Sequence, residues 1–100
     1  GYGGNDNSTT RFRRYKGEYY GVADDKVKPL LKEYTDASHL LVPNQWYEIR
    51  IRVEKGITTY SVNDEELFRY TLAGSEGDGH FGLRLLQNHV LFTDFKATIL

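Results

Sequence analysis

The sequence contains no cysteine, no methionine, only two prolines and a single tryptophan among its 100 residues. The absence of cysteine excludes disulfide bonds, thiolate nucleophiles and cysteine metal sites. It leaves the cellular compartment open, since many secreted bacterial proteins also lack cysteine. No segment approaches the ~20 consecutive apolar residues of a membrane-spanning helix.

Neither sign of charge dominates, because 13 Lys and Arg against 14 Asp and Glu give a formal net charge of −1. A nucleic-acid partner is therefore not expected, since phosphate binding requires a basic face. What the chain does contain is core material: 39% of the residues are hydrophobic and 14% are aromatic. These values predict one small domain covering residues 1–100.

The clearest pattern is the alternation of apolar and charged side chains from Tyr47 to Val53. A period of two indicates a strand with one face on a core and the other in water. We therefore predict an antiparallel sheet in the part of the chain from 43 to 100. Its first strands form a meander with turns at Lys55-Gly56 and Asn63-Asp64, and they are expected at about 46–54, 57–63 and 66–72.

Two closing strands are predicted beyond the meander, at about 80–86 and from residue 90 to the end. In the last strand the apolar residues first occupy even-numbered positions, at Val90 and Phe92, and then an odd-numbered one, at Phe95. A slip of one residue in a period of two predicts a β-bulge near Thr93-Asp94.

The part from 1 to 42 is less regular. It is predicted to contain a loop at 1–8, a strand at 9–15 and a short return strand at 19–22. Residues 23–43 are expected to form a long loop attached to the core by leucines, with one helical turn as an option. A loop of this length in a small domain is more often functional than idle.

Several motifs together resemble the concanavalin-A-like lectin/glucanase sandwiches. They are Trp46-Tyr47-Glu48-Ile49, Lys55-Gly56, Val62-Asn63-Asp64-Glu65-Glu66-Leu67-Phe68 and Gly79-His80-Phe81-Gly82-Leu83-Arg84. The segment from Gly4 to Tyr15 most specifically resembles a bacterial family of the Bacteroidetes type that is associated with polysaccharide degradation. A more distant resemblance is to the 3-keto-disaccharide hydrolase type.

This resemblance implies an all-β fold, an antiparallel β-sandwich of the jelly-roll, concanavalin A-like kind, of which the chain covers the C-terminal part. It implies carbohydrate binding or processing on plant or algal polysaccharide or oligosaccharide, and a secreted or periplasmic location. A polysaccharide lyase-like or glycoside-cleaving enzyme and a structural accessory sandwich stay open as alternatives. The expected partners are carbohydrate and either a second copy of the chain or a missing N-terminal segment of the same protein. No membrane partner is expected.

Arg11, Arg13 and Tyr15 are predicted to share one face of a strand and to bind substrate. Arginine binds carboxylates with two parallel hydrogen bonds, and tyrosine stacks on sugar rings. In uronate-cleaving lyases of the resembled class, such groups neutralise the sugar carboxylate. The alternative is a solvated strand face with cross-strand Arg–Glu pairs.

Arg84 and His89 are the predicted catalytic residues, on the condition that they converge with the arginines of the first strand. The unperturbed pKa of histidine, near 6.5, suits proton transfer. The alternative is an arginine that anchors a loop and a histidine at a turn.

Asn5 and Asn7 complete the predicted substrate-binding group. With Asp6 they offer oxygen ligands of the kind calcium prefers, but the D-x-D-x-D-G register is absent, so a simple Asx-turn loop is favoured. His39 and His80 lack zinc-ligand spacing. No metal or cofactor is therefore predicted, and no E-x-D-x-x-E motif supplies the paired carboxylates of a glycosidase.

Overall fold

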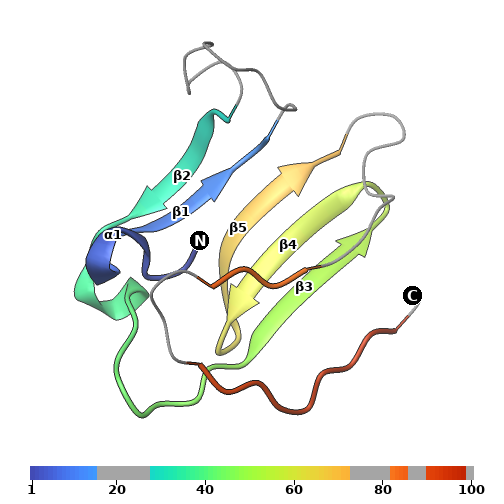
Figure 1. Ribbon diagram of the computed structural model, residues 1–100. Coiled ribbons are helices and arrows are strands. Elements are labelled where there is room, and N and C mark those ends of the chain that lie inside the picture. Colours follow the sequence, from blue (N-terminus) through green and yellow to red (C-terminus); the bar gives the residue numbers. More distant parts are fainter. Residues whose placement is uncertain (16–27, 73–81, 86–89, 99–100) are drawn as a thin grey trace.

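Residues 49–71 fold as a three-stranded meander in the computed structural model, which describes residues 1–15, 28–72, 82–85 and 90–98 (Figure 1). Its antiparallel strands are β3 (Ile49–Glu54), β4 (Ile57–Val62) and β5 (Glu65–Thr71), in that order. A second antiparallel sheet pairs β1 (Thr10–Arg13) with β2 (Leu30–Tyr34). The described chain is thus mostly β, with only a short helical turn α1 (Gly4–Asn7) and a 3₁₀ turn η1 (Ala37–His39).

Both predicted hairpin turns of the meander are confirmed. Lys55 and Gly56 have φ angles of 51° and 75°, and Asn63 and Asp64 have φ angles of 49° and 65°. Two consecutive left-handed residues make the type I′ turn, whose twist matches that of the flanking strands. The strand before the first turn begins at Ile49 rather than at residue 46.

A β-bulge occurs in β5, at a position where no local pattern predicts it. The register passes from Tyr60 opposite Phe68 to Ser61 opposite Glu66, so Leu67 is the extra residue. Leu67 is 1% exposed and is the most buried apolar residue described. Its carbonyl accepts a hydrogen bond of 2.7 Å from the Tyr34 hydroxyl, which joins β5 to the other sheet.

The prediction of a long loop at 23–43 is wrong for the segment that forms β2. Leu30–Tyr34 pairs antiparallel with β1, with Phe12 opposite Lys32. Its five residues, Leu-Leu-Lys-Glu-Tyr, do not alternate between apolar and polar, and its hydrogen-bonding partner comes from far earlier in the chain. The optional helical turn is confirmed by η1. The predicted return strand at 19–22 lies outside the described residues.

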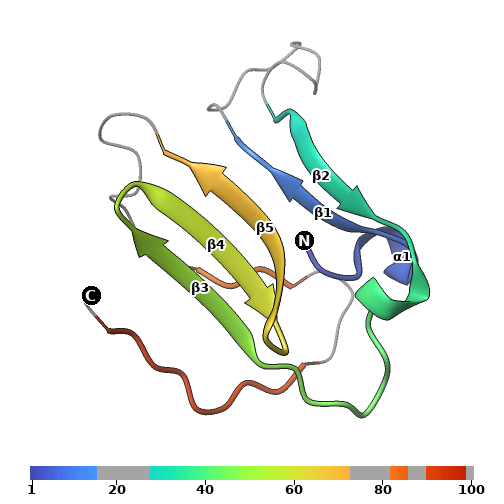
Figure 2. The same cartoon turned by 180° about the vertical axis from the view of Figure 1, so that it is seen from behind.

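The closing strands are not formed in the parts of 80–100 that the structure describes, because residues 82–85 and 90–98 lie in no strand. Asp94 has a φ of 55°, but without a paired strand this is no β-bulge. Apolar alternation predicts which side chains share a face, whereas a strand also needs a neighbour to accept its hydrogen bonds. Segment 82–85 crosses one face of the three-stranded sheet (Figures 1 and 2).

The two sheets lie edge to edge, with β1 beside β5 (Figures 1 and 2). Side chains join them: the Phe12 ring stacks on Phe68 at a centroid distance of 4.7 Å and meets Tyr60 edge-on at 5.2 Å. We call this junction the seam. No helix of the described residues is long and apolar enough to cross a membrane.

Candidate functional site

A hollow of about 320 Å³ lies at the seam, between the N-terminal turn, β1 and β5. Four of the residues predicted from the sequence line it, together with the two stacked phenylalanines of the seam. We call it the arginine hollow, and these lining residues are Asn5, Arg11, Phe12, Arg13, Tyr15 and Phe68.

The arginines are held by partners on β2 and just before it. The Arg11 Nε donates to the Glu33 carboxylate, which is the cross-strand pair that the alternative interpretation expected. The Arg13 Nη1 donates to the Lys28 carbonyl at 2.8 Å. A register shift between Phe12 and Arg13 interrupts the regular alternation of β1 against β2. The extra residue of this irregularity is Leu31 of β2, and the three consecutive β1 residues Arg11, Phe12 and Arg13 all line the hollow.

The N-terminal turn places Asn5 and Asn7 differently. Asn5 lines the hollow, and its Nδ2 donates to the Thr9 Oγ1 at 3.3 Å. Asn7 is used to fasten the turn, because its amide group both donates to the Leu41 carbonyl and accepts from the Leu41 N–H, each at 2.8 Å. Asn7 does not line the arginine hollow, so its predicted role in substrate binding stays a prediction that this hollow does not support.

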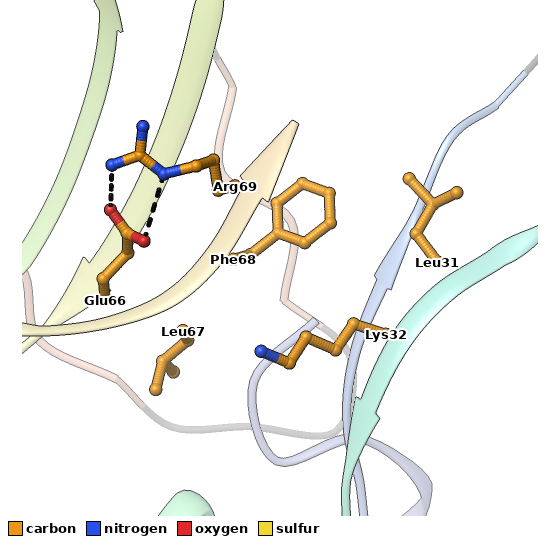
Figure 3. Close-up of a pocket in the computed structure, with 6 residues that line it drawn as sticks. All are labelled: Leu31, Lys32, Glu66, Leu67, Phe68 and Arg69. Atoms are coloured by element: carbon orange, nitrogen blue, oxygen red, sulfur yellow. Dashed lines mark hydrogen bonds and ion pairs between the residues drawn. The ribbon is translucent and has the colours of Figure 1, made fainter. Parts of the chain in front are cut away.

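A second hollow of about 220 Å³ opens farther along the seam (Figure 3). Its lining consists of Leu31, Lys32, Glu66, Leu67, Phe68 and Arg69. Arg69 forms a fork on the Glu66 carboxylate, with hydrogen bonds of 2.7 and 3.2 Å. These bonds lower the pKa of Glu66. Phe68 lines both hollows, so the two lie next to each other. This hollow was not predictable from the sequence, because two of its lining residues belong to β2, whose segment was expected to be a loop.

The predicted catalytic pair is not assembled by the described residues. Arg84 lies in segment 82–85, outside the strands, and lines neither hollow. His89 lies outside the described residues. The convergence of Arg84 and His89 on the arginines of β1 therefore stays a prediction. No group of three or more His, Asp or Glu side chains in the described ranges is placed to hold a metal ion.

The family of the chain is decided by its sequence from residue 1 to residue 95, which matches a domain of unknown function (DUF6250). The chain belongs to the DUF6250 family. Searches of curated proteins and of solved structures gave no match. The function of this DUF6250 domain must therefore be argued from its own residues.

A cluster around His39 is the part of the DUF6250 domain that the sequence does not predict, since the sequence shows only that His39 lacks zinc-ligand spacing. The Nδ1 of His39 is 2.5 Å from an oxygen of Asp36, and its Nε2 is 2.9 Å from an oxygen of Glu65. The Ser38 hydroxyl also donates to Asp36. The bonds to Glu65 and Asp36 raise the pKa of His39, and those from Ser38 and His39 lower the pKa of Asp36.

Proposed function

We propose that this DUF6250 domain is a carbohydrate-binding sandwich of the concanavalin-A-like class whose arginine hollow takes an acidic sugar of plant or algal polysaccharide. The observation that carries the proposal is the grouping of Arg11, Arg13, Tyr15 and Asn5 around one hollow. Two cations, an amide and an exposed aromatic ring are what a uronate requires: donors for its carboxylate and a flat face for its ring.

The geometry of the hollow supports a sugar-sized ligand. Its volume of about 320 Å³ lies at the lower end of the range for small-molecule sites, roughly 300–1,000 Å³. The Tyr15 side chain is 65% exposed, so its ring is available for stacking. A guanidinium has five N–H donors. The described bonds of Arg11 and Arg13 use one nitrogen each, which leaves other donors for a ligand carboxylate.

The sandwich architecture is part of the same proposal. Segment 82–85 crosses one face of the β3–β5 sheet, where a sandwich has its second layer (Figure 2). Ile49, Ile51 and Val53 share one face of β3 and are each 46% exposed, and a second layer over that face would cover them. A protein that binds such polymers works outside the cytoplasm, so the proposal includes a secreted or periplasmic location.

The test is binding of the purified protein to polyuronates and to neutral polysaccharides, by calorimetry, with the variants Arg13→Gln and Tyr15→Ala. Loss of a hydrogen bond to a charged group costs about 1.5–3 kcal/mol, which is about a tenfold or greater loss of affinity. We expect that loss for Arg13→Gln on polyuronates. Arg52→Gln is the matched control, because Arg52 is exposed on β3 and bonds to Glu54 at 2.9 Å.

Equal affinity of the wild type and Arg13→Gln for polyuronates, or no binding to any glycan, contradicts the proposal. Absorbance at 235 nm is followed in the same samples, because a lyase leaves unsaturated products. A rise in absorbance that is lost in Arg13→Gln would show that the protein is a lyase and not a binding module.

A further inference from the structure

His39 stands at the point where the two sheets meet. Its backbone belongs to η1, which follows β2, while its Nε2 reaches Glu65, the first residue of β5. Its carbonyl accepts a hydrogen bond from the Thr10 hydroxyl of β1, and Thr10 is fully buried. One residue therefore contacts β1 and β5, the two strands that face each other across the seam.

The protonation state of His39 follows from its partners. A neutral imidazole has one N–H and one lone pair, whereas the imidazolium has two donors. Both ring nitrogens of His39 face carboxylates, at 2.5 Å for Asp36 and 2.9 Å for Glu65. A lone pair at either position would face an anion and lose its hydrogen bond. Both contacts are satisfied only when the ring carries its proton.

The other groups that the structure describes around the His39 ring include a hydroxyl and phenols, and none of these carries a positive charge that could take the place of the imidazolium. The Ser38 hydroxyl lies 3.2 Å from Nδ1, and the Tyr34 ring of β2 lies against the imidazole with a centroid distance of 4.2 Å. Burial raises the pKa of the Tyr2 phenol, and the charges of Tyr47, Glu65 and Asp36 raise it further. Two carboxylates and the Tyr34 ring thus face the imidazole, and Lys32 places its Nζ 4.9 Å from the centroid of that Tyr34 ring.

We propose that His39 is a pH-sensitive latch: as an imidazolium it ties Glu65 of β5 to Asp36 beside η1 and so holds the two sheets together at the seam, and loss of its proton releases that tie. Without this tie, the seam depends on the Tyr34–Leu67 hydrogen bond and on the contacts of the Phe12 ring with Phe68 and Tyr60.

The direction of the pH effect follows from the raised pKa of His39. A group whose pKa is higher in the folded than in the unfolded state stabilises the fold fully below the unfolded value, near 6.5. That stabilisation is lost as the pH rises through the higher folded-state value. The latch is therefore closed in mildly acidic solution and opens towards alkaline pH.

The latch also bears on the arginine hollow, and this consequence rests on the proposed function. Phe68 of β5 forms one wall of that hollow, while Arg11 and Arg13 of β1 form another. Loosening the seam separates these walls. Polyuronate affinity is expected to fall over the same pH interval as stability.

The first experiment needs no glycan. The His39 ring is titrated by NMR in the intact chain, and its resonances are assigned by their loss in His39→Gln. We expect a midpoint above that of a free imidazole, lowered in Glu65→Gln and unchanged in Glu54→Gln, an exposed carboxylate that bonds to Arg52. Urea midpoints are then measured from pH 5 to 9, and we expect the wild-type value to fall over the His39 titration while that of His39→Gln does not.

A His39 midpoint at or below 6.5 in the wild type overturns the latch, and the titration itself is measured on the wild-type chain. An equal fall of the urea midpoint in wild type and His39→Gln overturns it as well. If both results support the latch while no glycan binds at any pH, the proposed function fails and the latch stands.

Discussion

Replacing Phe12 and Phe68 by leucine, singly and together, tests whether the two sheets are coupled through their side chains. The rings stack at a centroid distance of 4.7 Å with parallel planes. β1 and β5 do not pair through backbone hydrogen bonds, because β1 pairs with β2 in one sheet and β5 pairs with β4 in the other. The stack is therefore expected to contribute strongly to holding the described strands together.

The magnitude follows from burial and geometry. Both rings are half-buried, and leucine retains much of the apolar area, so each single variant loses mainly its ring contacts. An aromatic pair contributes about 0.5–1.5 kcal/mol beyond its area. Phe12 also loses its edge contact with Tyr60 at 5.2 Å. We expect about 1–2 kcal/mol for each single variant and a coupling energy of about 0.5–1.5 kcal/mol for the pair.

The assay is urea unfolding followed by circular dichroism, for the wild type, the two single variants and the double variant. With a slope of about 1–3 kcal/mol/M for a small domain, a loss of 1 kcal/mol lowers the midpoint by about 0.3–1 M. The control cycle combines Phe12→Leu with Val53→Ala, an exposed residue of β3. Its two effects are expected to add to within about 0.5 kcal/mol.

A coupling energy below about 0.3 kcal/mol for Phe12 and Phe68 would refute this reasoning, because single losses within one shared contact cannot simply add. Coupling of the same size in the control cycle would refute it too, since the effect would then belong to the whole fold and not to the seam.

Two further predictions concern left-handed positions and use the same urea assay. Gly3 has a φ of 70°, and a Cβ there would lie 2.7 Å from the Leu41 side chain, so Gly3→Ala should lower the free energy of unfolding by about 2 kcal/mol or more. In the control Gly4→Ala the nearest atom is 3.6 Å from the new Cβ, and the loss should be less than about 1 kcal/mol. Equal losses in the two variants would contradict this reasoning. Asp64 has a φ of 65°, so Asp64→Gly should stabilise by up to about 1 kcal/mol. The exposed ion pair with Arg50 that it removes, at 3.9 Å, contributes little, and a lower urea midpoint would show that this pair matters more than the turn.

The candidate site was predictable only in part. The chemistry and the alternating positions of three residues predict a shared face, and the fold does place Arg11, Arg13 and Tyr15 around one hollow with Asn5. The partners of that hollow were not predictable. Phe68 reaches it from β5, and Glu33 pairs with Arg11 only because β2 lies beside β1. Neither relation leaves a local pattern in the sequence.

The sequence by itself determined the features that depend on a few neighbouring residues. Alternation from Tyr47 to Val53 is enough for a strand, and the Asn63-Asp64 pair tolerates the left-handed angles of a tight turn. The closing segment shows the limit of this reasoning, because its apolar alternation predicted a strand that the described residues 90–98 do not form.

The tertiary structure decided everything that joins residues far apart in the chain. His39 and Glu65 are separated by 26 positions, and neither carries a sign of the other in the sequence. Whether a histidine is solvated, bound to a metal or held between two carboxylates depends on which groups the fold brings within hydrogen-bond reach. Periodicity records the face on which a side chain lies, whereas pairing, the seam and its ion pairs depend on how the sheets are placed relative to one another.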